Sequence, residues 1–173
     1  MRGPSGCGKT TVAKRLQAEV LEYGNSVIYC SADDYFYELR ADESGFEYFY
    51  DHSEVTNAHT FCQRKYLKAI ETGTDVIVVD NTNTKKCDLE FYARTAYAAG
   101  YDVELIEPQP IWIDDIDELC LKNVHGVPRQ VIEQQVENCK VRIDLEEFKH
   151  KVVSNIYPVP VPPVADAPGS PKA

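Results

Sequence analysis

The stretch of sequence that decides the fold lies at the start of the chain and reads Gly3-Pro4-Ser5-Gly6-Cys7-Gly8-Lys9-Thr10. Its spacing, G-x-x-x-x-G-K-[ST], is typical of a loop that wraps around the phosphates of a nucleotide. The glycines let backbone N–H groups turn toward the phosphates, while the lysine reaches the terminal phosphate oxygens and the threonine hydroxyl ligates Mg²⁺. A helix that begins at the end of the loop adds the positive end of its dipole to the same anion site. The pattern therefore predicts a P-loop that binds ATP and Mg²⁺.

The expected nucleotide-binding residues come from this loop and the residue after it. They are Gly3, Ser5, Gly6, Cys7, Gly8, Lys9, Thr10 and Thr11. Lys9 is also a candidate catalytic residue, because its charge can stabilise the phosphates during transfer, and Thr10 is a candidate Mg²⁺ ligand. Cys7 has two interpretations: its place among N–H groups at a helix start favours a reactive thiolate, or it fills a small space and packs inertly.

The length and composition of the chain limit the classes of protein to consider. Its 173 residues suit one domain with a buried core. The six cysteines are widely spaced and include no C-x-x-C pair, which is typical of reduced thiols and predicts the cytoplasm or the nucleus. No apolar run is long enough to cross a bilayer, so we expect no membrane association. The net charge of −10 argues against a general attraction for nucleic acid.

Helical and strand patterns alternate along the chain after the loop. Val12, Leu16 and Val20 recur at helical spacing, which predicts a helix over residues 9–23 that ends at Gly24. Apolar runs predict buried parallel strands at 27–30, 76–79 and 103–106, and helices are expected at 57–71, 87–99, 114–122 and 128–140. Right-handed crossovers between such strands give an α/β fold, a three-layer sandwich with a parallel sheet.

One strand of that sandwich has little room in this sequence. The strand that leads into a P-loop lies inside the sheet, yet only Met1 and Arg2 precede the loop. Its neighbours would then lose hydrogen-bond partners, at a cost of roughly 1–3 kcal/mol for each unpaired buried amide. The sequence therefore predicts a truncated first strand and a poorly paired sheet.

Carboxylates follow the first expected strand, in the segment Ser31-Ala32-Asp33-Asp34-Tyr35. The carboxyl ends of parallel strands face the nucleotide in such sheets, so both carboxylates are expected beside the loop. One of them can accept the proton of a hydroxyl that attacks the γ-phosphate. Alternatively, an aspartate at this point caps a short helix.

A further polar segment, Val79-Asp80-Asn81-Thr82-Asn83, ends the expected strand 76–79. Asp80 is a candidate to orient Mg²⁺ through water, and the Asn and Thr side chains can position phosphate or acceptor. The alternative is a polar turn at the end of a strand.

The segment 121–129 joins two expected helices and is interpreted as a lid. Its cations Lys122 and Arg129, together with His125 when protonated, can fold over the phosphates and neutralise charge in the transition state. Alternatively, this segment is a solvated junction between helices.

Four segments in this order resemble the polynucleotide-kinase-like P-loop domain of the Nedd-four-binding protein two family: the loop, S-A-D-D-Y-F, V-D-N-T-N and L-K-N-V-H-G-V-P. That family is itself similar to the phage polynucleotide 5′-hydroxyl kinase. The resemblance covers residues 3–142 and implies a P-loop sandwich of the nucleoside-kinase type that phosphorylates a 5′-hydroxyl with ATP. It also implies that Asp33 is the general base. The chain departs from the pattern at Leu121-Lys122, where the family has an arginine pair, and at Phe36, where the phage enzyme has a phosphate-binding arginine.

The sequence therefore predicts an ATP- and Mg²⁺-dependent kinase domain over residues 1–150, whose acceptor is the 5′ end of a short nucleic acid. A short acceptor is expected because eight acidic residues and one arginine lie between Asp33 and Glu54. Two alternatives remain: a kinase for a small hydroxyl metabolite, or a nucleotide-binding interaction module with little turnover. The proline-rich tail at 158–173 is expected to be disordered, and acts either as a tether or as a ligand for an SH3 or WW domain.

Overall fold

The protein is described by a computed structural model, which covers residues 1–39 and 46–149. Its centre is a parallel pair of strands, β1 and β4, in which Val27 lies opposite Val76 and Cys30 opposite Val79. The elements follow in this order: α1 (Lys9–Glu22), β1 (Val27–Cys30), η1 (Asp33–Phe36), β2 (Tyr37–Leu39), β3 (Phe46–Tyr48), η2 (His52–Glu54), α2 (Val55–Glu71), β4 (Val76–Val79), α3 (Lys86–Ala98), α4 (Ile116–Lys122), α5 (Arg129–Cys139) and α6 (Glu146–Lys149).

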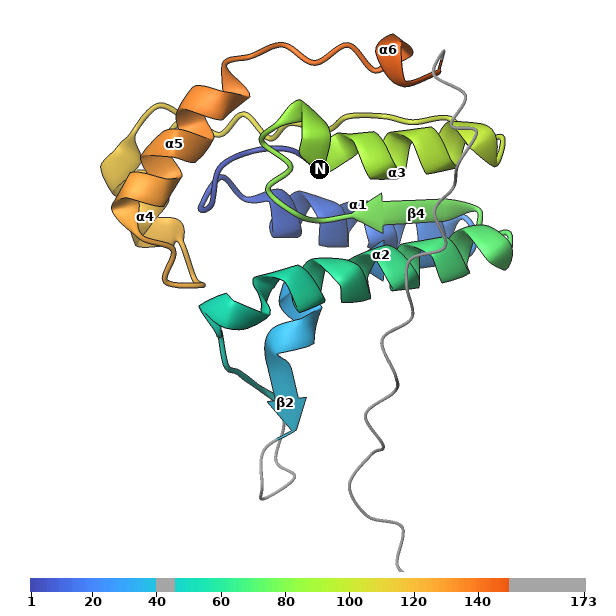
Figure 1. The fold of residues 1–173 in the computed structure, drawn as a ribbon, viewed down its shortest axis with the longest axis horizontal. Helices are drawn as coiled ribbons and strands as arrows, with labels where there is room; N and C mark the ends of the chain where they lie inside the picture. Colours follow the sequence, from blue (N-terminus) through green and yellow to red (C-terminus); the bar gives the residue numbers. More distant parts are fainter. Residues whose placement is uncertain (40–45, 150–173) are drawn as a thin grey trace, which may run out of the picture.

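Both faces of the β1–β4 pair are covered by helices (Figure 1). Successive residues of a strand point to opposite faces, so the apolar runs have two apolar sides. Ile28 and Ile77 pack with Ala58 and Cys62 of α2, whereas Val78 packs with Ala13 of α1. This arrangement confirms the α/β class and the parallel pairing predicted from the sequence.

The prediction of a strand at 103–106 is wrong, because these residues form no ladder with β4. The start of the chain lies between them: the Met1 amino group donates to the Val79 carbonyl at 2.8 Å, and the Arg2 N–H donates to the Ile106 carbonyl at 2.9 Å. Beyond Met1, a cavity of 390 Å³ is lined by β4 and by residues 101–106. A strand needs a hydrogen-bonded neighbour along its length. Within the described residues, only Met1 and Arg2 lie between β4 and residues 103–106 and bond to them. The parallel sheet of the described residues therefore has two strands.

A short antiparallel hairpin, which the sequence patterns had not predicted, follows β1. Its strands β2 and β3 pair Tyr37 with Tyr48 and Leu39 with Phe46. Figure 1 shows β2 pointing away from the helical body, beneath the start of α2. The hairpin begins directly after η1, so it is anchored at the end of β1 where the expected catalytic carboxylates lie.

The two helices flanking the expected lid pack against the P-loop. Leu119 of α4 and Ile132 of α5 are fully buried together with Cys7. Residues 123–128 join the two helices, and α6 packs against α3. Among the described helices, none combines the length and apolar character needed to span a membrane. Residue 150 and the proline-rich tail at 158–173 lie outside the described residues.

Candidate nucleotide-binding and phosphoryl-transfer site

The loop between Gly3 and Lys9 adopts a conformation that requires glycine at two positions. Gly6 has a φ of 82°, and a Cβ atom there would lie 2.1 Å from the carbonyl oxygen of Leu119. Gly8 has a φ of 89° and is the N-cap of α1. Within the described residues, no side chain caps this helix, and its first turn holds no acidic residue. The first turn therefore offers its N–H groups and the positive end of the helix dipole to an anion.

Lys9 is buried and lies over the loop. The residue is 9% exposed, and its Nζ donates to the Pro4 carbonyl at 2.8 Å. A carbonyl oxygen only partly satisfies an ammonium group, which has three protons to donate. Nζ also lies 4.0 Å from Cys7 Sγ, so at least one proton of the ammonium group is left to donate to a phosphate oxygen.

Thr10 and Asp80 come together from two distant parts of the chain. The Thr10 hydroxyl donates to Asp80 Oδ2 at 2.7 Å, and the Tyr29 hydroxyl donates to the same oxygen at 2.5 Å. Asp80 is 3% exposed and stands at the end of β4, beside the end of β1. Burial and the neighbouring carboxylate raise the pKa of Tyr29, so its phenol stays protonated and keeps donating.

The Thr10–Asp80 pair has the donor set that suits Mg²⁺, because both groups present oxygen. No group of three or more His, Cys, Asp or Glu side chains within the described residues is arranged to hold a metal ion. Mg²⁺ at this point would therefore complete its coordination with phosphate oxygens and water, as it commonly does in nucleotide sites.

Asp33 occupies the first position of η1, three residues beyond the end of β1. Its side chain is 46% exposed, and its Oδ1 accepts from the Tyr48 hydroxyl at 3.3 Å. On the other side, His125 Nε2 lies 3.5 Å from Asp33 Oδ2. The next residue, Asp34, is engaged differently, since its Oδ2 pairs with Lys65 Nζ at 2.9 Å. Of the two aspartates, Asp33 is thus the one that contacts the lid.

The amide side chains after β4 hold the two strand ends together. Asn81 Oδ1 accepts from the Ala32 N–H at 2.9 Å, which links the end of β4 to the end of β1. Asn83, with a φ of 44°, donates from Nδ2 to the Met1 carbonyl at 3.0 Å. The Thr82 carbonyl accepts from the Gly3 N–H at 3.0 Å. These contacts give the asparagines a role in fixing the loop and the strand ends.

The two lid cations are held by carboxylates of α4 and α5. Lys122 Nζ pairs with Glu118 at 3.3 Å and lies 4.6 Å from the centre of the Trp112 ring. Arg129 pairs with Asp117 and Glu133. The structure therefore places His125, rather than these two cations, against Asp33.

Three residues that hold the P-loop or Asp80 in place were not found by the sequence patterns. Gln135 Oε1 accepts from the Ser5 N–H at 2.8 Å, and Trp112 Nε1 donates to the Gly6 carbonyl at 3.2 Å. Tyr29 is the third, through its bond to Asp80. These three hydrogen bonds join segments that are distant in the sequence. The local pattern of an amphipathic helix or an apolar strand therefore cannot predict them.

The burial of Cys7 favours the packing interpretation of this residue. It is 1% exposed and lies against Leu119 and Ile132. Burial raises the pKa of its thiol, and the charge of Lys9 only partly opposes this effect. These observations favour a thiol that packs inertly over a reactive thiolate.

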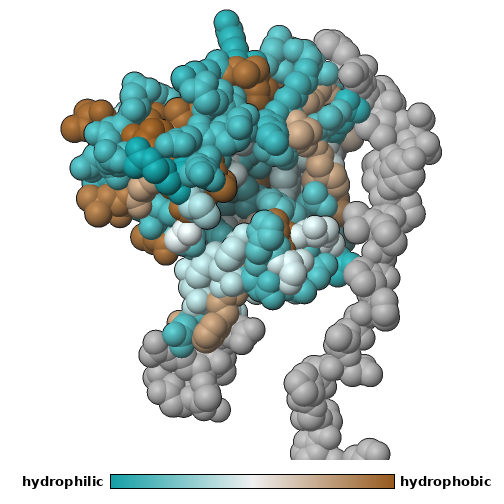
Figure 2. All heavy atoms as spheres, turned by 60° about the vertical axis from the view of Figure 1, so that its left-hand side comes forward, coloured by the Kyte–Doolittle hydropathy of each residue, from teal (hydrophilic) through white to brown (hydrophobic). Residues whose placement is uncertain are grey.

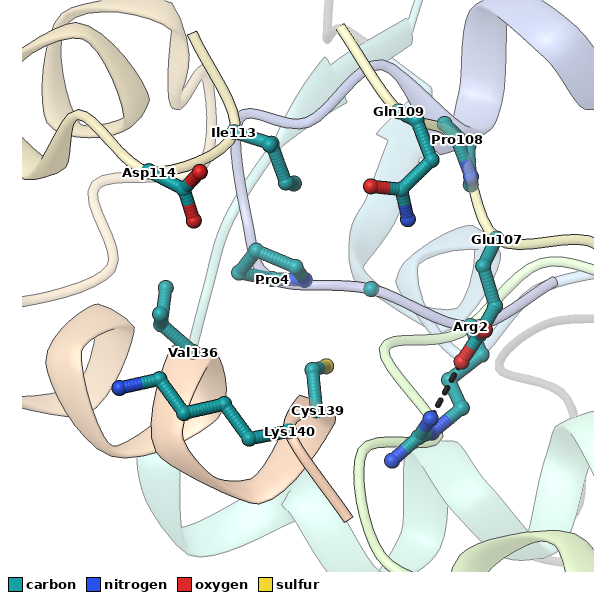
Figure 3. A pocket seen from close by; sticks show the side chains of 11 residues that line it. Arg2, Pro4, Glu107, Pro108, Gln109, Ile113, Asp114, Val136, Cys139 and Lys140 are labelled. Carbon is teal, nitrogen blue, oxygen red and sulfur yellow. Dashed lines mark hydrogen bonds and ion pairs between the residues drawn. The ribbon is translucent and has the colours of Figure 1, made fainter. Parts of the chain in front are cut away.

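A second hollow adjoins the outer side of the loop and has a volume of 220 Å³ (Figure 3). Its walls come from the loop, from the segment after 106 and from α5, with Pro4, Pro108, Ile113 and Val136 as apolar surfaces. Figure 3 shows the polar ends of Gln109 and Asp114 near the same space, and the Arg2–Glu107 ion pair at its edge. The hollow thus combines flat apolar walls with a few polar groups directly beside the phosphate loop.

Comparison with known proteins agrees with this geometry. A family model described as an AAA domain matches residues 1–142. Among curated proteins, NEDD4-binding protein 2 of Homo sapiens is 30% identical over 138 residues, which is 80% of this chain and 7% of that protein. No solved structure matches. The chain belongs to the AAA-domain family, and it is a P-loop domain of the kind found in NEDD4-binding protein 2.

Proposed function

We propose that this domain transfers the γ-phosphate of ATP to the 5′-hydroxyl at the end of a short nucleic acid. The observation that carries the proposal is the position of two carboxylates at adjacent strand ends: Asp80 bonded to the Thr10 hydroxyl, and Asp33 exposed beside the lid. A P-loop with one buried and one exposed carboxylate has the parts that phosphoryl transfer to a hydroxyl requires.

In this proposal the residues have separate roles. The loop and Lys9 bind the phosphates, while Thr10 and Asp80 hold Mg²⁺, which spreads the negative charge of the transferring group. Asp33 accepts the proton of the attacking hydroxyl as the new O–P bond forms. The bond between the γ-phosphorus and the bridging oxygen breaks, and ADP leaves with the electron pair. Asp33 suits the role of base because its carboxylate is both exposed and oriented by Tyr48.

The lid supplies the remaining candidates for charge stabilisation. We propose that Lys122 and Arg129 exchange their carboxylate partners for phosphate oxygens during transfer. Their present partners are side chains of exposed helical ion pairs, which are weak and easily exchanged. Replacing either cation by a neutral residue is then expected to lower kcat by at least roughly tenfold.

We place the base of ATP in the hollow beside Pro4. It adjoins the first loop residues, so a nucleotide with its phosphates on the loop can extend its ribose and base toward Pro108 and Val136. The apolar walls suit a flat ring, and Gln109 can both donate and accept a hydrogen bond.

A nucleotide-binding interaction module is the second candidate function. It is favoured by the pairing of both lid cations with carboxylates, and by the similarity to NEDD4-binding protein 2, whose name is that of a binding protein. In that case ATP binds without acceptor-dependent turnover. The departures at Phe36 and Leu121-Lys122 from the family pattern point the same way.

One assay separates these functions: incubation of the protein and γ-labelled ATP with 5′-hydroxyl oligonucleotides, nucleosides and sugars. The proposed function predicts that label appears on the oligonucleotides and that ATP consumption rises when they are added. Label on a sugar or nucleoside alone would identify a small-metabolite kinase. ATP binding without label on any acceptor would favour the interaction module.

A further inference from the structure

Exposed aromatic side chains gather on and around the β2–β3 hairpin. Six of them are at least 37% exposed, namely Tyr35, Tyr37, Phe46, Phe49, Tyr50 and Phe61. Figure 2 shows pale and light brown residues at the lower end of the coloured surface, whereas much of the upper body is teal. Single exposed aromatic residues are common on proteins, whereas several in neighbouring elements are typical of a binding surface.

The hairpin register places three of these rings on one face. Tyr37 lies opposite Tyr48, and Phe46 lies two residues before Tyr48 on the same strand. Residues directly opposite each other, and residues two apart on a strand, point to the same side. Tyr37, Phe46 and Tyr48 therefore form one aromatic face, with the backbone positions of Glu38 and Glu47 on the other.

This aromatic face leads directly to the proposed catalytic base. The ring centres of Tyr37 and Tyr48 are 5.2 Å apart, and those of Tyr48 and His125 are 4.8 Å apart. The Tyr48 hydroxyl then donates to Asp33 at 3.3 Å. An acceptor whose hydroxyl lies at Asp33 therefore has the rest of its molecule close to these rings.

One buried residue, Phe36, supports Tyr48 of this face and two neighbouring tyrosines. Phe36 is 6% exposed, and its ring contacts Tyr35 at 5.4 Å, Tyr48 at 5.9 Å and Tyr50 at 5.0 Å between centres. A fixed ring loses little conformational freedom when a flat ligand stacks on it, so such a surface suits stacking.

The charges around this face favour stacking over phosphate contacts. Asp33 accepts from Tyr48 of this face, and Asp51 and Glu54 follow β3 along the chain. The Lys65 ammonium group is paired with Asp34. A strand of phosphates would be repelled by these carboxylates, whereas an uncharged base is not. Aromatic rings bind bases of any sequence through their π faces.

We propose that the aromatic face of Tyr37, Phe46 and Tyr48 binds the unpaired base at the 5′ end of the acceptor by stacking, and thereby brings its 5′-hydroxyl to Asp33. The inference rests on the proposed function and names the part of the acceptor that is recognised. It makes Tyr37 and Phe46 determinants of acceptor choice, and it predicts that the nucleotides beyond the first few add little affinity.

The test compares two short 5′-hydroxyl oligonucleotides that differ only at the 5′ residue, one with its base and one abasic. Stacking contributes roughly 1–3 kcal/mol per base, so the KM for the base-bearing acceptor is expected to be on the order of tenfold lower. Tyr37→Ala and Phe46→Ala should raise that KM without changing the KM for the abasic acceptor. Phe46→Trp, which keeps an aromatic ring, should retain the preference for the base-bearing acceptor. Tyr23→Ala is the matched control, because Tyr23 is 83% exposed at the opposite end of α1 from the loop.

Equal KM values for the two acceptors, with transfer intact, would overturn the aromatic-face proposal and leave the proposed function standing. Anisotropy of the same labelled oligonucleotides with ADP and Mg²⁺ supplies a readout that does not need transfer. If no acceptor is phosphorylated, the proposed function fails, and base-dependent binding that Phe46→Ala weakens would still support the aromatic face. Binding that neither the base nor Phe46→Ala changes would overturn it, and would leave the rings as a surface for a protein partner. Thermal unfolding of each variant checks that the hairpin substitutions leave the domain folded.

Discussion

His125 Nε2 lies 3.5 Å from Asp33 Oδ2, so a residue of the lid contacts the carboxylate that we assign as the general base. The same imidazole lies against Tyr48, whose hydroxyl donates to the other oxygen of Asp33. The lid turn that carries His125 is held by Asn123, which accepts from the His125 N–H and donates to the Val127 carbonyl. Lid, hairpin and strand end therefore meet at one carboxylate.

Replacing the lid histidine should weaken transfer without weakening ATP binding. In His125→Ala, Asp33 loses one of its two neighbours and the lid loses its ring contact with Tyr48. Because the pair is partly exposed, we expect kcat/KM for the acceptor to fall roughly fivefold. His59→Ala, at an exposed position on α2, is the control. Steady-state kinetics with the oligonucleotide acceptor measure the effect, and an unchanged kcat/KM would show that the contact is incidental.

Tyr29→Phe removes one of the two hydroxyl groups that donate to Asp80 Oδ2. Groups that orient a metal-binding carboxylate typically change metal affinity by roughly 10–100-fold when removed. We therefore expect the Mg²⁺ concentration for half-maximal activity to rise about tenfold. Tyr101→Phe is the matched control, because it loses a comparable hydrogen bond, to the Thr74 carbonyl, away from the loop. A Mg²⁺ titration that is identical in the two variants would contradict the role given to Tyr29.

The assignment of the base of ATP to the hollow beside Pro4 predicts a difference between ATP and tripolyphosphate, which has no base. Val136→Phe fills part of the hollow and should weaken ATP binding about tenfold through overpacking. Its effect on tripolyphosphate should be small. Val131→Phe places the same side chain on an exposed position of α5 and is the control. Calorimetry with both ligands decides the matter, and equal weakening of the two would place the base elsewhere.

The buried thiols should be labelled more slowly than the exposed one. Burial raises the pKa of Cys7, and raises that of Cys30 to about 12, so the thiolate fraction at pH 8 is lower than for an ordinary cysteine. Labelling at both residues should therefore increase as the pH is raised above 8, and Cys87, which is exposed, should react first. Mass spectrometry after a short iodoacetamide pulse gives the order. Faster labelling of Cys7 than of Cys87 would revive the thiolate interpretation.

The parts of the fold that depend on local pattern could be predicted from the sequence. The four-residue spacing of Val12, Leu16 and Val20 gave the helix now seen as α1, and the β-branched run at 76–79 gave β4. The run at 103–106 has similar residues but forms no strand, because pairing depends on a neighbouring strand and not on the run itself. The β2–β3 hairpin was missed because each strand alternates over only three residues.

The candidate site divides in the same way. Asp33 and Asp80 could be expected near the loop, because the ends of adjacent parallel strands lie side by side. Gln135 and Trp112 reach the loop through tertiary packing of α5 and of the segment before α4, which no local pattern reports. His125 was considered only as an additional cation, and its contact with Asp33 depends on how the lid lies over the hairpin.

Transfer and nucleotide affinity, measured on the same preparations, separate phosphate binding by Lys9 from proton abstraction by Asp33. Wild type, Lys9→Ala and Asp33→Asn are each assayed for ATP affinity by calorimetry and for transfer of labelled phosphate to a 5′-hydroxyl oligonucleotide. We expect Lys9→Ala to lose both, whereas Asp33→Asn keeps its ATP affinity and loses roughly 10²–10⁴-fold in transfer. Near-normal phosphorylation by Asp33→Asn, or absence of transfer in the wild type, would contradict these roles.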